Sequence, residues 1–147
     1  MNTRKIVATL FLIIALVLGV LLFLEVNLPT TLGGYFNSEY YNQFGPLAIS
    51  IELLIAGYYL FIKHPKTNFV LAVFAFTALL DPIFNVTGLF TSLVPLYATI
   101  LFVGCALVAL WLSFTNTFSL GRISMIAAFG SFILGTAVEL FFNLWAG

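Results

Sequence analysis

The sequence predicts an all-α integral membrane protein, a bundle of five transmembrane helices in one membrane domain covering residues 1–147. Hydrophobic residues make up 63% of the chain and charged residues 7%, against roughly a quarter in an ordinary soluble domain. Five basic and five acidic side chains are too few to cover the surface of a soluble globule. Disorder would need low hydrophobicity and high net charge, and the formal net charge here is +0. Long apolar stretches then give the number of helices.

A helix needs about 20 mostly apolar residues to cross the hydrocarbon core. The first stretch follows Arg4 and Lys5, exceeds a signal-peptide core in length and has no A-x-A site after it, so we expect a retained helix. Pro65 separates the second stretch from the third, which is interrupted at Asp81-Pro82. Short links favour antiparallel neighbours. The predicted spans are residues 6–28, 46–62, 67–89, 93–114 and 122–145.

Five crossings place every basic residue on one side of the membrane. These residues precede the first span, lie between the second and third, or open the fifth: Arg4, Lys5, Lys63, Lys66 and Arg122. The positive-inside rule then predicts the N-terminus inside and the C-terminus outside. We therefore expect a multi-pass protein of the cytoplasmic membrane whose basic side faces the cytoplasm.

The outer loop, residues 26–45, is the longest polar segment. Gly33-Gly34 indicates a turn, and the loop is too aromatic for a free linker. We expect it to lie on the outer membrane surface or against a partner, with one short helical turn. An interfacial anchor is favoured over a substrate-binding loop. The loop aromatics are Tyr35, Phe36, Tyr40, Tyr41 and Phe44.

Three acidic residues fall inside the predicted spans. A rise of about 1.5 Å per residue puts Glu52 about 16 Å, Asp81 about 22 Å and Glu139 about 25 Å from the basic side. A charged carboxylate at the bilayer centre costs at least about 2.5–3.5 kcal/mol. We therefore expect these groups to be protonated, hydrogen-bonded, or facing water or a partner.

Each acid lies on a helix face of small residues. Small residues let helix backbones approach closely, so the acids are expected to face protein while Phe, Leu and Ile face lipid. The predicted packing residues are Ala48 and Ala56 beside Glu52, Ala72, Ala75 and Ala78 before Asp81, and Ala127, Ser131 and Gly135 before Glu139.

Two acid–amide pairs have a spacing of four, which puts both members on one helix face. Pro82 frees a backbone carbonyl, and a broken helix beside an acid is one pattern of ion sites in transporters. One hypothesis is a proton or cation site. The other is interhelical hydrogen bonding together with a kink at Pro82. The candidate site residues are Glu52, Asp81, Asn85, Glu139 and Asn143.

No motif predicts a catalytic residue, a metal site or a cofactor. One histidine, one cysteine and two methionines offer few metal ligands. His64, in a tight inner link, is interpreted as a solvated loop residue. Asn85-Val86-Thr87 is a formal glycosylation sequon at the predicted membrane edge. No basic patch of the kind that binds nucleic acid occurs, so nucleic acid is excluded as a partner.

The segment 46–76 resembles DoxX-type small membrane proteins. The matching features are Glu52 early in a helix, Gly57 soon after it, and the basic link from Lys63 to Lys66. The resemblance implies four helices, whereas five apolar stretches occur here, so membership of that family is not inferred.

Three functions follow from these features. The first is a non-catalytic subunit that packs in a larger membrane complex, with the bilayer and other subunits, or a second copy, as partners. The second is a small proton- or cation-coupled transporter or channel that uses Glu52 and Asp81. The third is a lipid-modifying membrane enzyme with a protonated carboxyl as acid or base. The missing catalytic motifs favour the first.

Overall fold

The chain is an all-α bundle. The computed structural model describes residues 3–26, 28, 30–36, 43–89, 94–115, 118 and 122–142, and none of these residues is in a strand. The predicted all-α fold is confirmed. Its elements are α1 (Thr3–Leu24), the 3-10 helix η1 (Leu32–Phe36), α3 (Gly45–Ile62), α4 (Thr67–Thr87), α5 (Leu96–Phe114) and α6 (Met125–Leu140).

Four helices, α1, α3, α4 and α5, are long and apolar enough to cross a membrane. They indicate a membrane-embedded protein. Helix α6 has 16 residues, which at the helical rise gives about 24 Å against a hydrocarbon core of about 30 Å. It begins later than the predicted fifth span because Ser124 caps it: the Ser124 hydroxyl accepts a hydrogen bond from the Ala127 N–H at 3.1 Å.

Helix α1 begins earlier than predicted and includes both basic residues before the apolar run. Nη1 of Arg4 donates hydrogen bonds of 2.6 Å to the carbonyls of Leu60 and of Phe61 at the end of α3. These carbonyls belong to the last turn of a helix, where the regular donors four residues on run out, and the Leu60 carbonyl also accepts the Lys63 N–H at 3.3 Å. The charged first turn of α1 is therefore held against the end of α3.

Helix α4 continues through Pro82, so the predicted interruption at Asp81-Pro82 is wrong. Proline has no N–H, which removes the helical donor for the Ala78 carbonyl. One missing bond does not end this helix of 21 residues, whose buried residues run from Thr67 to Asp81, directly before the proline. The helix ends instead at Gly88, whose φ of 83° is the left-handed conformation of a helix C-cap.

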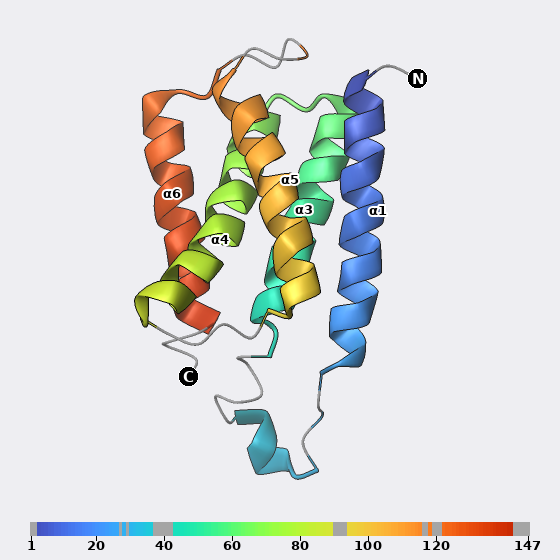
Figure 1. Ribbon diagram of the computed structural model, residues 1–147, viewed down its shortest axis with the longest axis vertical. Coiled ribbons are helices and arrows are strands. Elements are labelled where there is room, and N and C mark those ends of the chain that lie inside the picture. Colours follow the sequence, from blue (N-terminus) through green and yellow to red (C-terminus); the bar gives the residue numbers. More distant parts are fainter. Residues whose placement is uncertain are drawn as a thin grey trace.

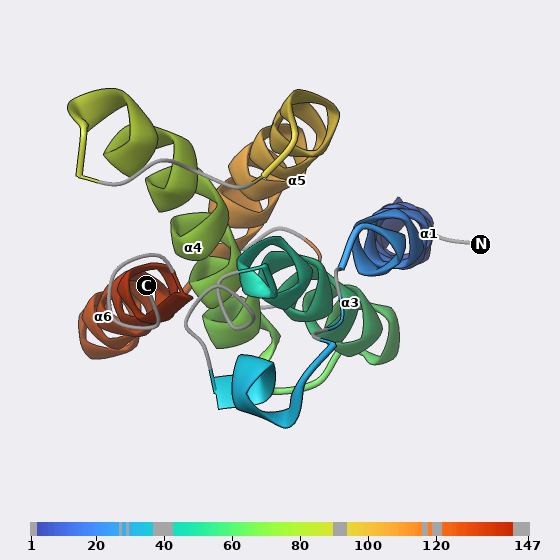
Figure 2. The same cartoon turned by 90° about the horizontal axis from the view of Figure 1, so that it is seen from below.

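Successive helices run antiparallel, and α4 lies at the centre of the bundle (Figure 1). It packs against α3, α5 and α6, while α1 packs on α3. Seen along the bundle, α4 passes between α6 and the other helices (Figure 2). The core between α4 and α5 includes an edge-on contact of Phe74 with Phe102, whose ring centroids are 6.4 Å apart.

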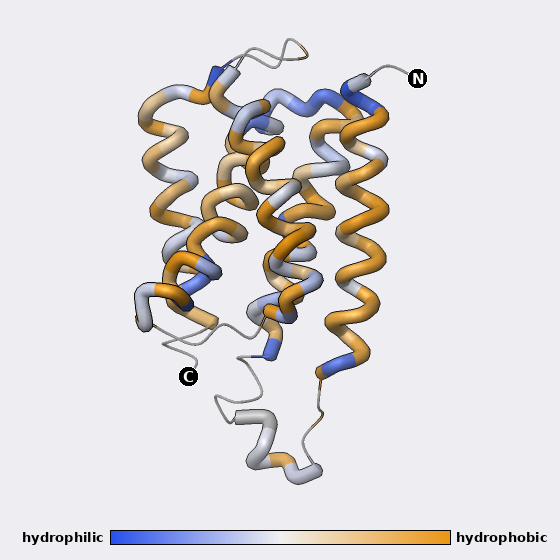
Figure 3. Tube along the Cα trace, viewed as in Figure 1, coloured by the Kyte–Doolittle hydropathy of each residue, from blue (hydrophilic) through white to orange (hydrophobic). Residues whose placement is uncertain are grey.

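Hydrophilic residues lie at the two ends of the bundle and hydrophobic ones between them (Figure 3). The start of α1, the α3–α4 link and the start of α6 share one end, and η1 lies at the other (Figure 1). The helical turn η1 agrees with the short turn expected in the outer loop. Two of the five loop aromatics, Tyr40 and Tyr41, lie outside the described residues, and the side chains of Tyr35 and Phe36 are likewise not described.

Candidate functional site: a buried carboxyl cluster

The three intramembrane acids come from three different helices. Glu52 lies on α3, Asp81 on α4 and Glu139 on α6. The side chains of Asp81 and Glu139 are 4% and 3% exposed. They are hydrogen-bonded to each other, and Glu52 is near enough for its charge to interact with that of Glu139. We call these three residues the carboxyl cluster.

Helix α6 packs against the bundle through one narrow face, which includes the acid Glu139. Ser131, Gly135 and Glu139 are its buried residues and follow one another at a spacing of four. A Cβ atom on Gly135 would lie 3.0 Å from the backbone nitrogen of Thr77 and 3.1 Å from Cβ of Phe76. Glycine therefore allows α6 to approach the α4 backbone closely, and this approach brings Glu139 beside Asp81 one turn further along.

Thr77 links the third acid to this contact. Its side chain is hydrogen-bonded to Glu52, and its hydroxyl donates to the Val73 carbonyl at 2.8 Å. A hydroxyl has one proton and two lone pairs. With the proton directed at Val73, a lone pair remains for Glu52, and an uncharged Glu52 carboxyl can donate to it.

One oxygen of Glu52 has no partner. Its Oε2 atom is buried and makes no hydrogen bond. A buried polar atom without a partner costs about 1–3 kcal/mol, so such atoms call for a specific reason. Here the atom adds an unused acceptor position to a cluster that already contains a carboxyl–carboxyl hydrogen bond.

The chemistry of the cluster is that of shared protons. A carboxylate can only accept hydrogen bonds, so two carboxyls bond to each other when one of them carries a proton. Carboxyls that share a site hold such a proton because two adjacent negative charges are costly. Among the residues that the structure describes, no group of three or more His, Cys, Asp or Glu has an arrangement for a metal ion.

Of the two other predicted site residues, the structure describes one. Asn85 is exposed at the end of α4, and Asn143 lies outside the described residues. The small packing residues Ala56, Ser131 and Gly135 are buried, while Ala48 and Ala127 are half-buried. Sequence reasoning missed Thr77, although the spacing of four between Thr77 and Asp81 could have indicated it.

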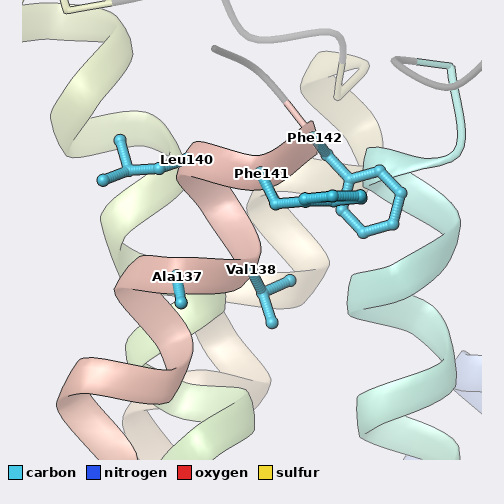
Figure 4. Close-up of a pocket in the computed structure, with 5 residues that line it drawn as sticks. All are labelled: Ala137, Val138, Leu140, Phe141 and Phe142. Atoms are coloured by element: carbon cyan, nitrogen blue, oxygen red, sulfur yellow. The ribbon is translucent and has the colours of Figure 1, made fainter. Parts of the chain in front are cut away.

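A hollow of about 470 Å³ lies near the end of α6 but does not open onto the acids. Its lining is apolar and includes Phe141 and Phe142, whose rings meet edge-on with centroids 5.1 Å apart (Figure 4). Glu139 is not among the lining residues. The carboxyl cluster is therefore a packed site and not the wall of this hollow.

Comparison of the chain with protein-family models, with curated proteins and with solved structures gave no match. Function is therefore argued from the geometry of the carboxyl cluster.

Proposed function

We propose that this chain is a small proton-coupled membrane transporter, or a channel for protons or small cations, in which the carboxyl cluster takes up and releases protons. The hydrogen bond between Asp81 and Glu139 carries the proposal, because it requires a proton held inside the bundle. Intramembrane ionisable groups are expensive and commonly belong to proton relays. The buried and unpartnered Oε2 of Glu52 gives a third group to which a proton could move.

The proposed topology has five crossings, with the start of α1 on the cytoplasmic side. The described basic residues support it, because the start of α1, the α3–α4 link and the start of α6 lie at the same end of the bundle (Figure 1). The positive-inside rule assigns that end to the cytoplasm. The short helix α6 would cross with local thinning of the bilayer.

Proton flux into proteoliposomes tests the proposal. With an imposed membrane potential and an internal pH dye, the wild-type protein should acidify the vesicles. Glu52→Gln should reduce this flux at least tenfold while the helical circular dichroism stays unchanged. Glu25→Gln is the matched control, because Glu25 is an exposed acid just after α1 and should leave the flux intact. No flux from the wild-type protein, or equal flux from Glu52→Gln, would contradict the proposal.

A second candidate is a non-catalytic subunit of a larger membrane complex. The exposed surface of α6 favours it: Met125 and Ile126 are each 87% exposed, and three residues of this helix are buried. A partner subunit, a second copy or lipid could cover such a face. Purification from native membranes in mild detergent distinguishes the two candidate functions. A subunit should retain a stoichiometric partner, and a transporter should not need one.

A further inference from the structure

The basic end of the bundle carries a second feature, unrelated to the acids. Arg4 and Lys5 in the first turn of α1 adjoin Lys63 and Lys66 in the α3–α4 link, and we call these four residues the basic rim. Arg4 binds the carbonyls at the end of α3, and Nζ of Lys5 lies 5.4 Å from the centre of the Phe61 ring. The two segments are thus joined, and the lysines of the link add their charge to those of α1.

The link that carries Lys63 and Lys66 is held in a fixed conformation. The His64 ring stacks on Tyr59 with centroids 4.3 Å apart, and its Nδ1 accepts the Lys66 N–H at 3.0 Å. The Thr67 hydroxyl contacts the His64 carbonyl at 2.6 Å. Both lysine side chains are exposed. Their ammonium groups are therefore presented to solvent from a preorganised turn.

Lys63 occupies a backbone position that lysine does not favour. Its φ of 55° and ψ of 50° are left-handed, and it is the C-cap of α3. Glycine or asparagine is the usual residue there, because a Cβ atom is strained in this region. The Lys63 N–H caps the helix as that of any residue would, so lysine has no conformational advantage here and its charged side chain is the feature that calls for an explanation.

An apolar strip leads from the bilayer region to the basic rim. The exposed hydrophobic residues of α3 fall at spacings of four, three and four, which is one helix face. The last of them, Ile62, directly precedes Lys63. The strip consists of Ile51, Ile55, Tyr58 and Ile62.

We propose that the basic rim and this strip bind one anionic phospholipid, with its phosphate at Lys63 and Lys66 and its acyl chains along α3. The acidic residues that the structure describes lie within the helices or at the opposite end of α1, so none of them competes for the rim. Basic groups next to transmembrane helices attract anionic headgroups. The apolar strip favours a lipid over free phosphate, because phosphate has no group to cover it.

Native mass spectrometry in a neutral detergent tests the proposal by titration with phosphatidylglycerol, phosphatidylcholine and inorganic phosphate. The wild-type protein should retain phosphatidylglycerol in preference to phosphatidylcholine. The attraction of about 1 kcal/mol per basic residue near a membrane corresponds to about fivefold in affinity. Lys63→Gly with Lys66→Gln should therefore weaken phosphatidylglycerol binding about 25-fold.

The control variant is Arg122→Gln, which removes a basic residue from the same end but outside the rim, and it should bind as the wild type does. Glycine suits the left-handed position, so thermal unfolding should show that the double variant still folds. Equal retention of the two lipids, an unchanged double variant, or an equal loss in Arg122→Gln would overturn the proposal. Competition by inorganic phosphate at the lipid's concentration would overturn it in favour of a free-phosphate site.

Discussion

Two helix pairs in this bundle approach each other through a glycine but bury different chemistry. Where α1 meets α3, a Cβ on Gly57 would lie 3.1 Å from Cγ of Leu12, and Ser50 donates to the Ala15 carbonyl at 2.7 Å. Where α4 meets α6, Gly135 lies against Thr77, and the contact continues into Asp81 and Glu139. Away from the Arg4 contact at its basic end, the first pair is an apolar contact with the neutral Ser50 hydrogen bond. The second pair ends in two carboxyls.

The difference shows that close packing does not require the acids. Along the middle of α1 and α3, the small residues Gly57 and Ser50 allow the close approach, as expected for helices in lipid. Burying a carboxyl costs free energy even when it is uncharged and hydrogen-bonded. The acids between α4 and α6 therefore point to a role other than helix association, and four substitutions test this distinction.

Gly135→Ala should have the largest effect on stability. Its Cβ would stand 3.0 Å from a backbone nitrogen, which cannot move aside as a side chain can. We expect a loss of about 3 kcal/mol, the upper end of overpacking costs, in the free energy of unfolding measured in mixed detergent micelles. Gly130→Ala on the same helix has nothing within 4 Å and should change stability by no more than about 1 kcal/mol. Equal losses in the two variants would refute the close approach of α6 to α4.

Thr77→Val should come next, with a loss of about 1.5 kcal/mol. Valine keeps the shape of threonine but removes the hydroxyl that bonds to Glu52, whose Oε2 already lacks a partner. Thr136→Val is the control, because its hydroxyl bonds to the Phe132 carbonyl within α6, away from the acids. The control should lose less than about 0.5 kcal/mol. If the Thr77 variant were as stable as the control, Thr77 would not link Glu52 to the other two acids of the carboxyl cluster.

Gly57→Ala should cost less than Gly135→Ala, about 1 kcal/mol. The nearest atom to its new Cβ is the Leu12 side chain, which can shift, although the Leu12 backbone nitrogen at 3.2 Å limits the adjustment. Gly104→Ala on α5, with nothing within 4 Å, is the matched control. The same micelle unfolding assay applies. A loss of stability larger than that of Gly135→Ala would contradict the expectation that the α4–α6 contact is the less tolerant of the two helix pairs.

Ser50→Ala should have the smallest effect, about 0.6 kcal/mol, the average for an interhelical hydrogen bond in a membrane. Unlike Thr77→Val, it should leave proton flux unchanged, because Ser50 bonds to a backbone carbonyl of α1 and not to an acid. Proteoliposome flux and micelle unfolding together check this. Reduced proton flux in the Ser50 variant would contradict the proposal that the α4–α6 contact has a role in transport and the α1–α3 contact does not.

Composition and apolar length predicted the all-α fold well, because each helix must satisfy its own backbone in lipid. The ends of the helices were harder to predict. Arg4 extends α1 by bonding to the end of α3, and Ser124 delays the start of α6. Helix α4 continues through Pro82, and its packing against three neighbours is not visible in the local sequence.

The carboxyl cluster was predicted in part. A spacing of four placed Asp81 and Glu139 on faces of small residues, but helical spacing identifies a face and not the helix that will contact it. The meeting of α3, α4 and α6 is a property of the tertiary fold. Asn85 is four residues from Asp81 but lies beyond the buried part of α4. Thr77 was not predicted, because a hydroxyl within an apolar helix usually bonds to the backbone of its own helix.

Infrared spectroscopy of the carboxyl C=O stretch tests most directly whether the cluster holds a proton. At neutral pH in bilayers, the wild-type protein should show the band of protonated carboxyls, and Asp81→Asn with Glu139→Gln should weaken it to the contribution of the uncharged Glu52 carboxyl. The Glu25→Gln spectrum should match that of the wild type. A spectrum with ionised carboxylates alone at neutral pH would contradict a shared proton between Asp81 and Glu139.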